Sequence, residues 1–138
     1  MNSNSTSVGS TIRPAAGTVP AAPAAGTRTG AAIDRDGFDS CVLFVQAGAA
    51  TGAPTTLSLT AKLTECATSG GSYTDVPGAA ITAITAVSTS ARVNVDLSGC
   101  LRYLKVSETV AFTGGTAPTL GAASSVVLGG ADSYPVTG

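Results

Sequence analysis

The chain has 138 residues, which is enough for one domain, and its hydrophobic fraction of 43% is ordinary for a protein with a folded core. Only 11% of the residues are charged, the net charge is −1, and the seven basic residues are scattered singly, which argues against a nucleic-acid-binding surface. The chain has no histidine and none of the common nucleotide-binding or nucleophile motifs, so we expect no catalytic residue, no metal site and no cofactor.

Residues 1–32 form a block of their own, rich in Ser, Thr, Ala, Gly and Pro, in which Arg13 and Arg28 are the only charges. Three prolines interrupt any helix that the Ala pairs would begin. The larger apolar residues, such as Ile12 and Val19, are too sparse to form a core. This composition predicts an extended N-terminal arm that lies against neighbouring subunits with Ile12, Arg13 and Val19 as contacts, and whose removal leaves the domain folded. The alternative is a tail without a binding role.

From residue 33 onward the pattern is that of β-strands. Residues 41–47 are apolar at both odd and even positions, which predicts a central strand covered on both faces. Residues 55–65 alternate without interruption between apolar and polar side chains, which predicts a half-buried strand with Leu59 and Leu63 facing inward.

Further strands are predicted at 80–88, 91–97, 101–112 and 124–129, separated by Gly- and Pro-containing turns. Glu108 falls in the same phase as the apolar residues of its strand. Because an unpaired buried carboxylate is costly, we expect a β-bulge there that turns Glu108 outward.

These strands predict an all-β fold over residues 33–138, a jelly-roll or Greek-key β-sandwich. Its core is expected to contain eight side chains that share the inward phase. They are Leu57, Leu59, Leu63, Val93, Val95, Leu104, Val106 and Phe112.

Three further features bear on chemistry and location. Asp34, Asp36 and Asp39 are oxygen ligands of the kind calcium takes, but their spacing is not that of an EF-hand, and a turn is the better interpretation. The sequence has no long apolar segment for a membrane and no signal-peptide pattern, so we expect synthesis in a cytoplasm. The three cysteines, Cys41, Cys66 and Cys100, are therefore expected to be free thiols.

Three sequence blocks carry a resemblance to a known family: IDRDGFDS at 33–40, SGGSYTDVPGA at 69–79 and LRYLKV at 101–106. Over about residues 33–132 the chain resembles the small jelly-roll decoration, or cement, proteins of tailed bacteriophages, which sit on the HK97-like capsid lattice. The chain departs from them in its longer arm and in having Tyr73 in place of tryptophan.

The resemblance implies a non-enzymatic virion protein on the outer capsid surface that stabilises the head by bridging subunits of the major capsid protein. The alternative is a neck, tail or host-recognition β-sandwich module. The low surface charge and the expected sheet edges favour self-association as a homodimer or homotrimer. Tyr103 lies opposite in phase to Leu104, so we expect it to face outward at an interface.

Overall fold

The computed structural model describes residues 8–133, 135 and 136, and within them the chain is almost entirely β-structure. A short 3-10 helix, η2 (Val8–Ser10), comes first. The described strands, in chain order, are β1 (Arg13–Ala16), β2 (Gly26–Thr29), β3 (Ile33–Asp34), β4 (Phe38–Thr51), β5 (Thr56–Cys66), β6 (Thr74–Ala80), β7 (Ser90–Asp96), β8 (Tyr103–Thr113) and β9 (Thr119–Ala131). This part of the chain contains no helix with the length and hydrophobicity needed to cross a bilayer.

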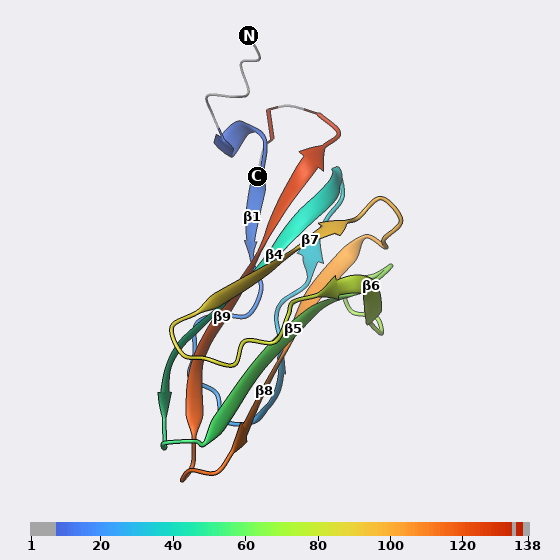
Figure 1. Cartoon of the computed structure of the whole chain (residues 1–138). Helices are drawn as coiled ribbons and strands as arrows, with labels where there is room; N and C mark the ends of the chain where they lie inside the picture. The colour runs from blue at the N-terminus through green and yellow to red at the C-terminus, as the bar shows by residue number, and fades with distance from the viewer. Residues whose placement is uncertain (1–7, 134, 137–138) are drawn as a thin grey trace.

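The strands form two antiparallel sheets that pack face to face as a β-sandwich (Figure 1). Sheet A has the order β1-β9-β4-β7, and sheet B has the order β2-β8-β5-β6, with β3 also pairing with β8. The first long-range pairing joins the first and last strands, and the next joins the second strand to the one before the last. This nested order is that of a jelly roll, and it confirms the predicted fold class.

The core lies between the inner faces of the two sheets, as the alternating patterns predicted. Five of the eight expected core side chains are buried: Leu59, Leu63, Val95, Leu104 and Val106. The other three, Leu57, Val93 and Phe112, are half-buried and pack against the edge of this core. The strand expected at 80–88 is mostly a loop, because its large apolar residues recur every third position; Ile81 and Ile84 turn into the core and bond the backbone of β5.

The N-terminal segment differs from the expected arm, because residues 13–29 belong to the sandwich itself. β1 is an edge strand of sheet A and pairs with β9, while β2 is an edge strand of sheet B and pairs with β8. Between them the chain crosses from one sheet to the other and bridges Ala21 to Ala122. The boundary expected at residue 32 therefore does not separate an arm from a domain, and residues 1–7 lie outside the described chain.

Small residues let this segment pass close to the sandwich. A side chain on Gly30 would place its Cβ atom 2.2 Å from the Gly17 carbonyl oxygen, and one on Gly17 would meet the Ser124 hydroxyl oxygen at 2.4 Å. Both distances are far below van der Waals contact, so the two glycines are required by close packing. A composition that is typical of a linker here reflects a tight crossing between sheets.

Glu108 corrects another expectation, because β8 has no bulge at that position and the carboxylate is fully buried. The Nε atom of Arg28 donates to one Glu108 oxygen at 2.5 Å, and the Thr18 hydroxyl donates to the other at 2.7 Å. The Thr18 amide in turn donates to the Ser124 hydroxyl at 2.7 Å. The N-terminal segment thus supplies the partners that make burial of this charge tolerable, and it joins the two sheets in doing so.

Candidate interaction surface

The outer face of sheet A is apolar at its centre although nothing in the described chain packs over it. On β4, Cys41, Leu43 and Val45 are buried between the sheets, whereas Val42 and Phe44 point outward and are partly exposed. The sequence pattern predicted cover on both faces of this strand, and the structure provides it on the inner face only.

Neighbouring strands extend this patch sideways. Val42 lies between Val127 of β9 and Asn94 of β7, and Phe44 lies between Ser125 of β9 and Arg92 of β7. Cross-strand neighbours on one face are close enough for their side chains to touch. The result is an apolar centre that the polar side chains of β7 border on one side.

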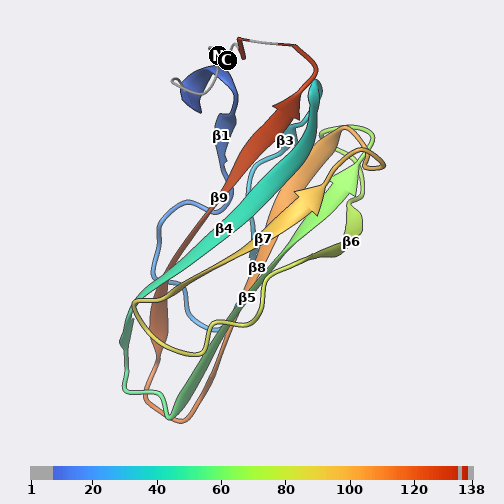
Figure 2. The same ribbon diagram turned by 45° about the horizontal axis from the view of Figure 1, so that its top comes forward.

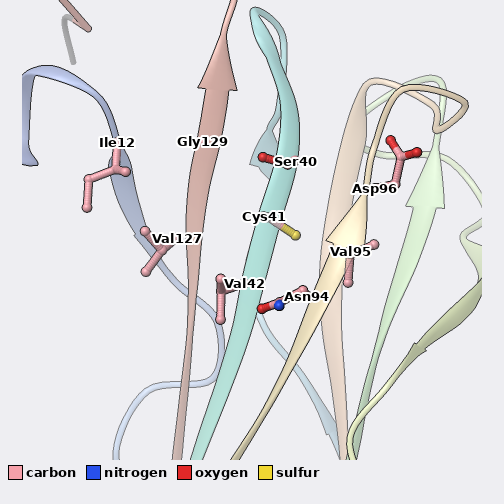
Figure 3. Close-up of a pocket in the computed structure, with 9 residues that line it drawn as sticks. All are labelled: Ile12, Ser40, Cys41, Val42, Asn94, Val95, Asp96, Val127 and Gly129. Carbon is pink, nitrogen blue, oxygen red and sulfur yellow. The ribbon is translucent and has the colours of Figure 1, made fainter. Parts of the chain in front are cut away.

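A shallow hollow of about 510 Å³ opens on this face (Figure 3). In Figure 3, Ile12 and Val127 lie on its β1–β9 side, and Asn94 lies on its β7 side. Gly129 has no side chain to fill the space beside Ser40, its partner on β4. A Cβ atom at Gly129 would meet only the Ser40 hydroxyl oxygen at 3.6 Å and Ile12 at 4.0 Å, so the hollow has room for a group from another molecule.

The charges at the border lie on the edge strand β7. Arg92 and Asp96 are both exposed and point to the same outer face as Asn94. The Ser98 amide and hydroxyl donate to Asp96 Oδ1 at 2.9 and 2.7 Å, and these bonds hold the pKa of Asp96 below its ordinary value. The patch therefore has one fixed negative and one positive charge on a single strand.

The four residues expected at an interface do not form one site. Ile12 lines the hollow, and Val19 is 65% exposed on the crossing segment. Arg13 is engaged within its own chain, where it donates to the Asp34 carbonyl oxygen and lies 4.9 Å from the centre of the Phe38 ring. Tyr103 is partly exposed on the outer face of sheet B, where its cross-strand partner on β3 is Asp34.

Sequence analysis missed Val42, Phe44 and Val127 as interface candidates. For Val42 and Phe44 the signal was present in the apolar run 41–47, which was interpreted as a doubly covered strand. Such a run does not reveal whether the second cover comes from the same chain or from another one.

The carboxylates of the aspartate-rich turn form ion pairs with arginines. Arg102 donates to both oxygens of Asp34, at 3.0 and 2.8 Å, and this ion pair lowers the pKa of Asp34. Arg35 lies 3.8 Å from Asp39. Among the described residues, no group of three or more acidic or cysteine side chains is arranged to hold a metal ion.

The cysteines are free thiols, as expected from the sequence. Burial raises the pKa of Cys41 to about 12, with a further contribution from nearby Cys100. Burial and the neighbouring Glu65 also raise the pKa of Cys100. Since the thiolate is the reactive form, these two side chains are poor nucleophiles.

No protein-family model matches the chain, and no curated protein matches it either. Among solved structures, the chain is similar to the SPBc2 prophage-derived protein YomS, with a TM-score of 0.43 and 15% sequence identity. The similarity covers 85% of this chain and 94% of that chain. At this level of similarity, no property of YomS transfers to the present protein.

Proposed function

We propose that this protein is a structural component of a bacteriophage particle that decorates the outer surface of the capsid and bridges subunits of the major capsid protein. The observation that carries the proposal is the uncovered outer face of sheet A, where Val42, Phe44 and Val127 are partly exposed at the centre of a charge-poor surface. The resemblance of residues 33–132 to phage decoration proteins supplies the class of partner.

A face of this kind suits permanent attachment. Covering apolar side chains is favourable by about 25 cal/mol per Å², and the low density of charge keeps the cost of removing water small. A clip that binds the assembled lattice, and not the separated subunits, stabilises the lattice by mass action.

The size of the outer face of sheet A limits the area that one copy can bury against a partner. Four strands about 4.8 Å apart and seven residues long give a flat area of roughly 400 Å². A specific interface buries at least about 1,000 Å² over both partners. One such contact amounts to roughly 800 Å² over both partners, which is below this value, so firm attachment calls for more than one sheet A face per bound unit.

The test compares two lysine substitutions that lie on opposite faces of the sandwich. Val42→Lys puts a charge at the centre of the outer face of sheet A, and Thr60→Lys puts the same charge at an exposed position of sheet B. Each purified variant is mixed with capsids stripped of this protein, and co-sedimentation measures binding, while circular dichroism checks that both variants are folded.

We expect Val42→Lys to lose binding and Thr60→Lys to bind like the wild type. Equal binding by Val42→Lys would rule out sheet A as the attachment face. A stained gel of purified virions tests the assignment to the capsid separately. A decoration protein is present in proportion to the major capsid protein, whereas a handful of copies per particle would favour the neck, tail or host-recognition alternative.

A further inference from the structure

The edge of sheet A at β7 is the least protected strand edge in the described structure. The other edge of sheet A, β1, has four residues and contains Pro14. In sheet B, β2 has four residues, and β6 contains Pro77 and a register irregularity against β5. Short strands, prolines and bulges are the usual ways in which proteins block pairing at an edge.

By contrast, β7 contains no proline. Its seven residues pair with β4 in one uninterrupted register, from Ser90 opposite Gln46 to Asp96 opposite Ser40. Figure 2 shows β7 beside β4, and no described strand of sheet A pairs with its other side.

The directions of the backbone groups follow from the ladder. The Leu97 amide donates to the Asp39 carbonyl oxygen, and the Ala47 amide donates to the Thr89 carbonyl oxygen, each at 2.8 Å. Since antiparallel residues alternate in direction, the odd-numbered residues of β7 bond β4. The N–H and C=O groups of Arg92, Asn94 and Asp96 therefore point away from β4, toward the open edge.

The side chains of the same three residues are self-complementary. We propose that a second copy of this chain pairs with β7 in antiparallel fashion, with Asn94 opposite the partner's Asn94. A two-fold axis at this position places Arg92 opposite the partner's Asp96 twice, once on each side of the axis. Within the described chain, the Arg92 guanidinium has no ion-pair or hydrogen-bond partner, so it is available for this contact.

The proposed register agrees with the backbone as well as with the charges. In this register residues 92, 94 and 96 each lie in a hydrogen-bonded pair with the other copy. These are the residues whose backbone groups face the open edge. On the inner face it places half-buried Val93 opposite the partner's Val95, which continues the core across the junction. The Asp96 carbonyl oxygen already has a weak contact with the Cys100 thiol at 3.8 Å, and its second lone pair remains for the partner's amide.

The dimer would have an eight-stranded sheet with two outer faces side by side. This inference stands on β7 alone and does not depend on the assignment to a capsid. If both hold, the dimer doubles the attachment area estimated for one sheet A face.

The first experiment is a charge swap followed by analytical ultracentrifugation. We expect the wild-type protein to sediment as a dimer. Arg92→Asp places like charges opposite each other twice, and should weaken the dimer by about tenfold to a hundredfold. The double variant Arg92→Asp/Asp96→Arg restores opposite charges and should restore the dimer, although it loses the contacts of Asp96 with Ser98.

The second experiment tests the register with two cysteine variants in a Cys100→Ser background. Cysteines at position 94 would face each other across the two-fold axis, about 5.5 Å apart at Cα. Cysteines at position 90 would be separated by eight residue steps, roughly 26 Å along the strand. A short bifunctional thiol crosslinker should therefore join Asn94→Cys chains into covalent dimers and leave Ser90→Cys chains single.

Three outcomes would overturn the inference. They are a wild-type protein that stays monomeric at millimolar concentration, an oligomer that Arg92→Asp leaves unchanged, and crosslinking at position 90 in preference to position 94.

Discussion

Removing the arginine partner of Glu108 tests the role of the N-terminal segment most directly. Glu108 is fully buried, whereas the Arg28 side chain is 23% exposed and lies on β2, in the segment that sequence analysis placed outside the domain. Arg28→Ala leaves Glu108 Oε1 without its donor, while the Thr18 hydroxyl still serves Oε2. Arg28 also donates to the Val19 and Ala122 carbonyl oxygens at 2.7 Å, and these bonds are lost too.

The expected loss of stability follows from the buried Glu108 charge that Arg28→Ala leaves without its cation. Breaking a buried ion pair by removing one partner costs about 3–5 kcal/mol. The remaining threonine bond and the partial exposure of Arg28 put the expected loss near the lower end, at about 3 kcal/mol. Replacing both members by apolar residues, as in Arg28→Met/Glu108→Leu, removes the unpaired charge, and the double variant should be more stable than Arg28→Ala alone.

Urea unfolding followed by circular dichroism measures these differences in the free energy of unfolding. The matched control is Arg102→Ala, which breaks an ion pair with Asp34 in which both side chains are largely exposed, 52% and 40%. Such a surface pair contributes about 0–1 kcal/mol. If Arg28→Ala is no more destabilising than Arg102→Ala, the argument that the N-terminal segment neutralises a buried charge is wrong.

Three further outcomes are expected. Deleting residues 2–30 should prevent folding, because it removes β1, β2 and both partners of the buried carboxylate; a cooperative thermal transition in the truncated protein would contradict this. Thiol titration should find three free thiols in denatured, unreduced protein, while in native protein buried Cys41 should react last because its pKa is raised to about 12; a count of one would reveal a disulfide. The lowered pKa of Asp34 means that its pair with Arg102 stabilises the protein above about pH 4, and that this contribution is lost as the pH falls through the folded-state pKa. Urea unfolding should therefore show that Asp34→Asn costs up to about 1 kcal/mol at pH 7 and progressively less as the pH is lowered below about 4.

The local alternation of side chains was enough to predict most of the sandwich. The pattern of residues 55–65 determines which side of β5 is buried, because side chains alternate across a strand whatever its partners are. The same reasoning identified Leu59, Leu63, Leu104 and Val106 as core residues.

Pairings between distant segments were decided only in the tertiary structure. The sequence of β1 has no apolar period, and it is a strand because β9 offers an unpaired edge opposite it. Glu108 is buried without a bulge because Arg28, 80 residues away, reaches it. The pattern of β4 predicted two covered faces, and only the packing of the sheets shows that the described chain covers just one of them. The physical reason is the same in each case: alternation is a property of one strand, whereas pairing and cover depend on what lies across from it.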